Sequence, residues 1–120
     1  MTEKTLSKAN LWNFTGTAHW FRHPLARKIV YTEGVQHVVV HGGAYWLINE
    51  IVFNQDNPVI AAEDFQVWRL AVAADKTAIL TCGDGNDGVV FKKQLDFTDF
   101  PLDEICFYVI NKTILLPSEY

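Results

Sequence analysis

The chain has 120 residues, of which 49% are hydrophobic, 20% charged and 13% aromatic. A chain of this length forms one domain, and this much apolar material excludes intrinsic disorder. No run reaches the ~18 consecutive apolar residues that a membrane helix needs, and the N-terminal residues lack the basic-then-apolar order of a signal peptide. We therefore expect a single cytoplasmic domain over residues 1–120, with no membrane segment.

The net charge of −4 is unevenly distributed along the chain. Residues 1–55 carry five lysines and arginines against three carboxylates, whereas residues 56–120 carry five against eleven. An acidic chain is a poor non-specific binder of nucleic acid, because attraction to phosphates supplies most of that affinity. We therefore expect no nucleic-acid partner, and an acidic surface that suits a protein partner with a basic surface.

The first third of the chain predicts a short helix and two strands. Residues 2–12 favour an N-terminal helix in which Leu6 is one of the packing residues. Residues 17–23 favour a strand that Pro24 ends, and the β-branched residues in 29–32 favour a second strand.

The stretch from Tyr31 to Asn54 is the most apolar part of the chain, and it predicts a hairpin followed by a helix. Glu33-Gly34 lies between two β-branched runs, which favours a tight turn and a second, central strand over residues 35–40. Gly42-Gly43 would end that strand. Apolar residues then recur with a helical period that predicts one buried central helix: Ala44, Leu47, Ile48, Ile51 and Val52.

The rest of the chain reads as strands joined by short turns. We expect one helical turn at Ala61-Ala62 and another at residues 99–104. The predicted strands cover residues 65–73, 77–82, 89–95, 105–110 and 113–116. Together these elements predict an α+β domain, in which an antiparallel sheet of about six or seven strands packs on one apolar central helix, with a short N-terminal helix.

One side of the predicted central helix carries a polar group flanked by aromatic residues, namely Trp46, Asn49, Glu50 and Phe53. If the sheet covers only the other side of the helix, this patch is exposed, and tryptophan and phenylalanine are typical interface anchors. The alternative is that a neighbouring segment covers it. These four residues are our candidates for a protein-binding site.

All four histidines fall within 23 residues as two H-x3-H pairs, namely His19 with His23 and His37 with His41. Residues four apart on a strand face the same way, and imidazole is the commonest metal ligand in proteins. The four side chains are therefore a candidate metal or acid–base site. The competing interpretation is that they are capping, surface or satisfied core histidines.

Several short motifs resemble those of a family of small uncharacterised bacterial proteins, a domain of unknown function associated with plasmids, phages and other mobile DNA. The resemblance covers nearly the whole chain. It lies in the runs Phe14-Thr-Gly-Thr17, Trp20-Phe-Arg-His23, Tyr31-Thr-Glu-Gly-Val35, Ala44-Tyr-Trp-Leu-Ile48, Asp99-Phe-Pro-Leu-Asp103 and Leu116-Pro-Ser-Glu-Tyr120. It implies a host-interaction or counter-defence role as readily as any other, and it transfers no catalytic residue.

Two functions from different classes follow. The first is a small acidic interaction protein without catalysis or cofactor, which binds another protein through its acidic C-terminal half or through the Trp46 and Phe53 side of the helix. The second is a His-centred metal-dependent or acid–base enzyme that uses Glu50 as an additional group. A homodimer formed through an edge strand is compatible with both.

Overall fold

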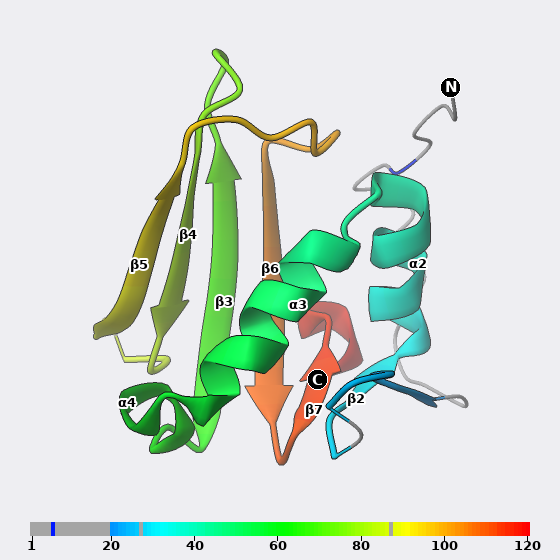
Figure 1. Ribbon diagram of the computed structural model, residues 1–120, viewed down its shortest axis with the longest axis vertical. Helices are drawn as coiled ribbons and strands as arrows, with labels where there is room; N and C mark the ends of the chain where they lie inside the picture. The colour runs from blue at the N-terminus through cyan, green and yellow to red at the C-terminus, as the bar shows by residue number, and fades with distance from the viewer. Residues whose placement is uncertain (1–5, 7–19, 27, 87) are drawn as a thin grey trace.

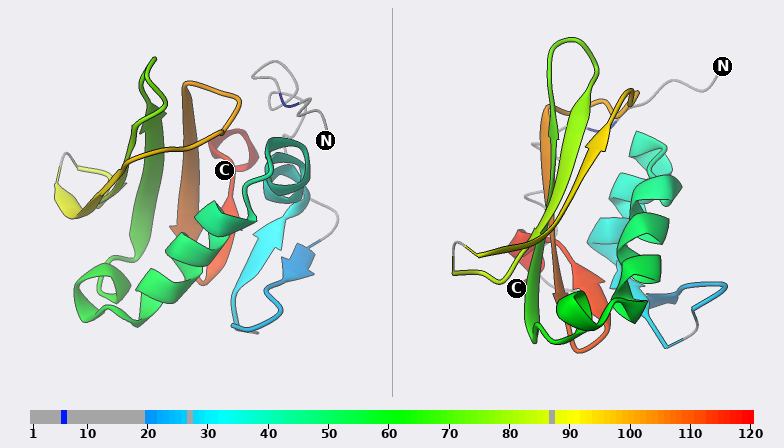
Figure 2. Two further views of the ribbon diagram at one scale, coloured as in Figure 1. Left: turned by 45° about the horizontal axis from the view of Figure 1, so that its top comes forward. Right: turned by 60° about the vertical axis from the view of Figure 1, so that its left-hand side comes forward.

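The computed structural model describes residues 6, 20–26, 28–86 and 88–120. A seven-stranded sheet with the order β1-β2-β7-β6-β3-β4-β5 forms its centre. Helices α2 and α3 lie on one face of the sheet, and the short helix α4 lies at one end of it (Figures 1 and 2). The predicted N-terminal helix falls outside the described residues except for Leu6, which is buried.

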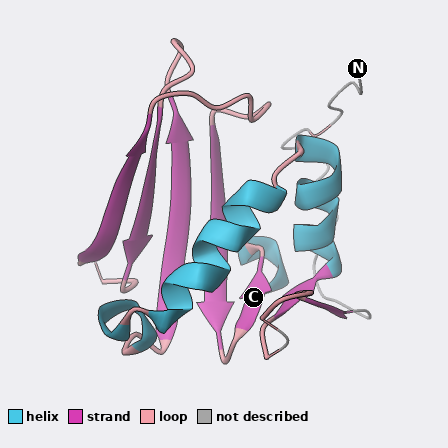
Figure 3. Cartoon of the chain, viewed as in Figure 1, coloured by secondary structure: helices cyan, strands magenta, loops and turns pink. Residues whose placement is uncertain are grey.

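Figure 3 shows the helices and strands along the chain. The strands are β1 (Trp20–Arg22), β2 (Val30–Thr32), β3 (Phe65–Val72), β4 (Ala78–Gly83), β5 (Val89–Leu95), β6 (Glu104–Ile110) and β7 (Thr113–Leu115). Among the described residues, the α-helices are α2 (Glu33–Gly42), α3 (Tyr45–Phe53) and α4 (Pro58–Ala61), and two 3-10 helices follow α3 and β7, namely η1 (Asn54–Asp56) and η2 (Pro117–Glu119).

The sheet is mixed, because β2 and β7 run parallel while the other neighbouring pairs are antiparallel. The number of strands agrees with the prediction, and the α+β class is confirmed. The purely antiparallel arrangement is wrong at this one pair. Val30 of β2 lies beside Thr113 of β7, and a hairpin signal in the sequence cannot reveal a contact between strands so far apart in the chain.

The predicted strand over residues 35–40 is also wrong, because this segment is the centre of helix α2. The predicted turn at Glu33-Gly34 is the first turn of that helix. Valine disfavours a helix by at most about 0.7 kcal/mol relative to alanine, whereas burying one valine gains about 1.5 kcal/mol or more. The residues that α2 buries recur at helical spacing and are Gly34, Val35, Val38, Val39 and Gly42.

Both ends of α2 are capped. Thr32 is the N-cap, and its hydroxyl oxygen accepts a hydrogen bond from the backbone N–H of Val35 at 3.3 Å. Gly43 adopts a left-handed conformation with φ 61°, and its backbone N–H donates to the carbonyl of Val39. The predicted break at the two glycines is therefore the end of a helix, after which α3 begins.

The carboxylate of Glu119, in η2, binds the N-terminus of α2, although the two are far apart in the sequence. It accepts a hydrogen bond from the Thr32 hydroxyl at 2.6 Å, from the backbone N–H of Gly34 at 3.3 Å, and from the backbone N–H of Leu116 at 2.9 Å. A negative charge at this position also interacts favourably with the helix dipole. The first turn of α2 is thus completed by a residue 87 positions away from its N-cap.

The helix-facing side of the sheet forms the core. Along β3, Gln66, Trp68 and Leu70 are buried and alternate with more exposed residues. Helix α3 crosses this face diagonally (Figure 1), and its buried residues are Leu47, Ile48, Ile51 and Val52. A helix is therefore present where the sequence predicted one, and these four residues belong to the predicted buried set. The fifth, Ala44, is buried but precedes the helix as its N-cap. The prediction of one central helix is wrong, because α2 lies on the same face of the sheet as α3 (Figure 1).

Replacing Glu119 with alanine is expected to lower the free energy of unfolding by about 2 kcal/mol, because the variant loses three hydrogen bonds and the charge at the α2 N-terminus. Urea unfolding followed by circular dichroism measures the effect. Glu104→Ala, on the exposed end of β6, is the matched control. Equal stability of the two variants would contradict this role for Glu119.

Candidate functional site

A cleft of about 800 Å³ opens at the end of the sheet where β6 turns into β7. We call it the terminal cleft. One wall comes from the β1–β2 connection, the opposite wall from the C-terminal end of α3 with η1 and α4, and the β6–β7 turn lies between them (Figure 1). Its volume is typical of sites for small molecules and short peptides.

Two bulky apolar side chains line the terminal cleft and remain accessible. Leu25 from the β1–β2 connection is 77% exposed, and Phe53 at the end of α3 is 52% exposed. Deeper in the cleft the lining is formed by Ile29, Val52 and Val109, which belong to the hydrophobic core. The cleft thus offers an apolar floor and an apolar rim to a bound chain.

Five charged side chains also line the terminal cleft, and their signs are segregated. The positive charges, Lys28 and Lys112, lie toward β2 and β7. The negative charges lie toward β3 and α4 and are Asp56, Glu63 and Asp64. Within the described part of the chain, none of the five forms an ion pair with another residue. Both ends of the cleft are therefore available to charged groups of a ligand.

A buried amide network holds the acidic wall in place. Gln66 is 3% exposed, and its side chain exchanges two hydrogen bonds with the side chain of Gln55, at 2.8 and 2.9 Å. The same side chain donates to the carbonyl of Ile60 in α4 and accepts a hydrogen bond from the indole N–H of Trp68. These bonds fix η1 and α4 to the sheet, so the carboxylates of this wall start from a rigid backbone.

The four residues of the predicted binding patch all lie on α3 but differ in their exposure and contacts. Phe53 lines the terminal cleft and is exposed, as a binding residue should be. Trp46 is only half-buried but packs against the core. Asn49 and Glu50 both make hydrogen bonds inside the molecule. A binding role for these four residues stays a prediction, and Phe53 has the strongest structural support.

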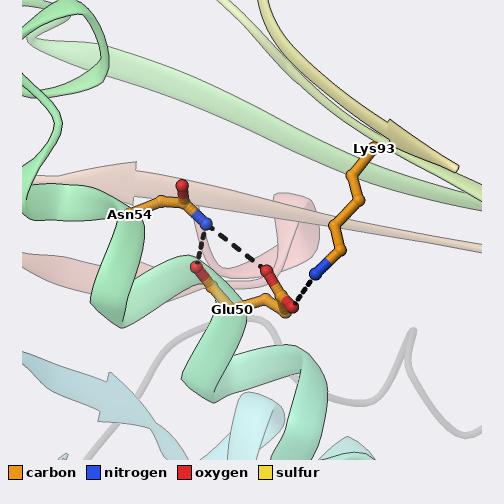
Figure 4. A network of polar contacts seen from close by, with 3 residues as sticks. All are labelled: Glu50, Asn54 and Lys93. Atoms are coloured by element: carbon orange, nitrogen blue, oxygen red, sulfur yellow. Dashed lines mark hydrogen bonds and ion pairs between the residues drawn. The ribbon is translucent and has the colours of Figure 1, made fainter. Parts of the chain in front are cut away.

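Glu50 bridges α3 and the edge strand β5 (Figure 4). Its carboxylate accepts a hydrogen bond from the ammonium group of Lys93 at 2.5 Å and a longer one from the side-chain amide of Asn54 at 3.4 Å. Asn54 also donates to the backbone carbonyl of Glu50 at 2.7 Å. The carboxylate that the enzyme hypothesis used as an additional group is therefore engaged in an ion pair between two elements of the fold.

His23 is buried, and hydrogen bonds engage both nitrogens of its ring. Its Nδ1 accepts hydrogen bonds from the backbone N–H groups of Leu25 and Ala26, at 3.1 and 3.0 Å. Its Nε2 lies 2.8 Å from Oδ1 of Asn49, an acceptor. This places the proton of the neutral ring on Nε2. His23 thereby shapes the β1–β2 connection and links this wall of the cleft to α3.

His37 and His41 lie on another element than His23. His37 and His41 lie one turn apart on α2 with their ring centroids 4.3 Å apart, and His19 is outside the described residues. Burial, together with the neighbouring His41, lowers the pKa of His37. Within the described ranges, no three histidines, cysteines or carboxylates gather as a metal site would require. A catalytic or metal-binding role of the histidines stays a prediction.

The two cysteines are free thiols on opposite faces of the sheet. Cys82 pairs in register with the buried Trp68, whereas Cys106 pairs with the exposed Arg69. Burial, together with the charge of Glu63, raises the pKa of Cys82 to about 12. Burial also raises the pKa of Cys106, although Arg69 opposes this effect. Neither thiol is activated as a nucleophile.

Fold and site together define a small α+β protein with a charged terminal cleft. The chain belongs to a family of unknown function, DUF6876, whose family model matches residues 5–120. No curated protein matches the chain, and no solved structure does. Among the described helices, none has the length and apolar character needed to cross a membrane.

Sequence reasoning missed most of the residues that line the terminal cleft. It noted that basic residues outnumber acidic ones in residues 1–55, and that acidic residues concentrate after residue 55. It did not bring the two together, because Lys28, Asp64 and Lys112 come from separate segments that meet only in the folded sheet. The uneven distribution of charge along the chain was the only sign of the cleft in the sequence. The order of the strands in the sheet, which brings these charges together, could not be read from it.

Replacing Asn49 with alanine is expected to lower the free energy of unfolding by about 2 kcal/mol, because the buried Nε2–H of His23 loses its acceptor. Urea unfolding measures the loss, and ¹⁵N NMR of the imidazole reports a change in the tautomer. Asn86→Ala, in the exposed β4–β5 loop, is the control. An unchanged tautomer together with wild-type stability would refute this role of Asn49.

The Cys82 thiol is expected to resist alkylation. With its pKa at about 12, its thiolate fraction at pH 8 is roughly a thousandfold below that of a free cysteine. Mass spectrometry after iodoacetamide treatment, with and without urea, measures the protection. Rapid modification of Cys82 in the folded protein would contradict the burial that the structure assigns to it.

Proposed function

We propose that this protein is a non-catalytic binding protein that holds a basic, partly apolar segment of another protein in the terminal cleft. The observation that supports the proposal most strongly is the set of five cleft charges without ion-pair partners in the described part of the chain. Charges of both signs that are available beside a cleft can complement the charges of an external ligand.

The acidic wall is the part of the cleft that selects a basic partner. Asp56, Glu63 and Asp64 come from η1 and the α4–β3 connection, within nine residues of one another. They belong to the half of the chain that holds eleven of the fourteen carboxylates. Long-range attraction would accelerate the encounter with a basic surface, and this acceleration falls as salt screens the charges.

The apolar rim supplies the second component of binding. Leu25 and Phe53 stand on opposite walls of the cleft and are both largely exposed. Exposed bulky apolar residues beside a cleft are typical anchors for a partner chain, because their burial contributes most of the binding free energy. A partner segment that carries an apolar side chain next to a basic one matches this arrangement.

A His-centred enzyme has weaker support. His23 uses both ring nitrogens in hydrogen bonds that shape the β1–β2 connection. Glu50 is paired with Lys93. The remaining pair, His37 and His41, lies on α2 rather than in the terminal cleft. The binding proposal uses the cleft as it is and requires no further group.

The resemblance to small bacterial proteins of plasmids and phages suggests a biological setting for such binding. In that setting the partner would be a host protein, and the function would be host interaction or counter-defence. This setting remains a prediction drawn from resemblance, and the binding proposal is independent of it.

The test is affinity capture from a lysate of the native host at low and high salt, with quantitative mass spectrometry. The double variant Glu63→Gln/Asp64→Asn is expected to reduce recovery of the specific partner roughly tenfold, because two favourable charge contacts are lost. The matched control Asp96→Asn/Glu104→Gln removes the same charge outside the cleft.

The same pattern of captured proteins for the wild type and for Glu63→Gln/Asp64→Asn would contradict the proposal. A partner that both double variants lose equally would indicate a general effect of net charge instead of recognition by the cleft. Phe53→Ser provides a second variant, and it too should weaken capture, because Phe53 is exposed and its removal does not open the core.

A further inference from the structure

We infer that the terminal cleft recognises the free carboxyl terminus of its partner, with the terminal carboxylate bound by Lys28, Asn111 and Lys112. This inference rests on the proposed function, since it names which part of a partner protein enters the same cleft. The ligand class is a C-terminal peptide segment that has an apolar last residue and a lysine or arginine shortly before it.

The donors for the carboxylate come from the segments that lead into two neighbouring strands, β2 and β7. Val30 of β2 donates its backbone N–H to the carbonyl of Lys112 at 3.0 Å, so Lys28 and Lys112 start from adjacent backbones. Asn111 stands next to Lys112 and also lines the cleft. In the described part of the chain, no hydrogen bond or ion pair engages the side chains of Lys28, Asn111 and Lys112. Two ammonium groups and one amide are thus available to a carboxylate.

The β6–β7 turn fixes the backbone from which the side chains of Asn111 and Lys112 extend. Asn111 and Lys112 both have positive φ values, 51° and 60°, which is the conformation of a tight two-residue hairpin turn. The turn is tied on one side to β2 through the carbonyl of Lys112 and on the other to β3, where Phe65 pairs with Ile110. Donors that extend from a fixed backbone lose less conformational entropy on binding than donors on a free loop.

The neighbouring carboxylates favour a singly charged anion over a phosphate. Asp64 directly precedes β3, and β3 pairs with the end of β6 just before the turn, so the backbone of Asp64 lies near the β6–β7 turn while its carboxylate lines the acidic side of the cleft. A dianion at the lysines would be repelled by Asp64. A carboxylate followed at a short distance by a cationic side chain places each charge beside its opposite.

The apolar floor fits the stretch of ligand between the two charges. Ile29, Val52 and Val109 lie at the base of the cleft, and Phe53 stands at its rim. An apolar last side chain would contact these residues while its carboxylate reached the lysines. The segregation of charge therefore gives the bound peptide a direction, with its terminus toward β2 and its basic residue toward α4.

The experiment titrates ¹⁵N-labelled protein with a pool of N-acetylated Arg-Xaa-Leu tripeptides, prepared once as free acids and once as C-terminal amides. For the wild type, the amides are expected to bind at least tenfold more weakly than the acids. In Lys112→Asn this difference is expected to disappear. Asparagine tolerates positive φ, so the turn is preserved at a residue whose φ is 60°.

The chain offers a closely matched control. Lys76 is a turn lysine between β3 and β4 with φ 71°, and it does not line the cleft. Lys76→Asn makes the same change of charge in the same backbone conformation, and it should retain the full preference for free acids. The variant Asp64→Asn, compared with Asp96→Asn, tests the acidic wall with the same peptides.

The outcomes separate the two proposals. Equal binding of acids and amides that still depends on Asp64 would overturn the carboxylate inference and leave the proposed function standing. An acid preference that Lys112→Asn retains would also overturn it. No binding of either pool, or binding that neither Asp64→Asn nor Lys112→Asn weakens, would overturn the use of the cleft in both proposals.

Discussion

The carboxylate of Glu119 at the N-terminus of α2 is the contact on which the arrangement of the first half of the chain depends. It ties η2 to Thr32 at the end of β2 and to the first turn of the helix. Once α2 is fixed, Gly43 ends it and α3 must start close by. Helix α3 then presents Asn49 to His23, and His23 in turn shapes the β1–β2 connection. One wall of the terminal cleft therefore depends on the hydrogen-bonded cap at the N-terminus of α2.

Local patterns predicted the second half of the chain well, because three of its strand pairs, β3 with β4, β4 with β5 and β6 with β7, join neighbours in sequence. Each of the strands β3 to β7 lies where alternation and turn residues placed it. The prediction for the first half was wrong where contacts between residues distant in sequence determine the secondary structure. Residues 35–40 read as a strand because valine favours strands, yet residue 119 completes the helical cap there and α2 buries its valines at helical spacing. The helical turn predicted at residues 99–104 is absent for a related reason, since Glu104 pairs with Ala71 in the sheet.

The candidate site could be predicted only in part. The position of Phe53 on the exposed side of a buried helix followed from periodicity, as did the burial of its neighbours Ile51 and Val52. The roles of Asn49 and Glu50 did not, because His23 and Lys93 reach them from segments 26 and 43 residues away. The terminal cleft is assembled from segments that span most of the chain, so its charge pattern is a property of the sheet order. Composition showed that the charges were unequal between the two halves, but not that they would meet.

The parallel pairing of β2 with β7 also has a consequence for biosynthesis. The residues on one side of this contact are made early, and their partners near residue 113 follow some 83 positions later. Until then β2 has no parallel neighbour, and the N-terminus of α2 lacks the Glu119 carboxylate. Long-range closure of this kind slows folding, and it leaves apolar surface exposed on the nascent chain. Most of the chain must therefore leave the ribosome before α2 gains this cap, and until then the valines of this segment stay exposed on the nascent chain.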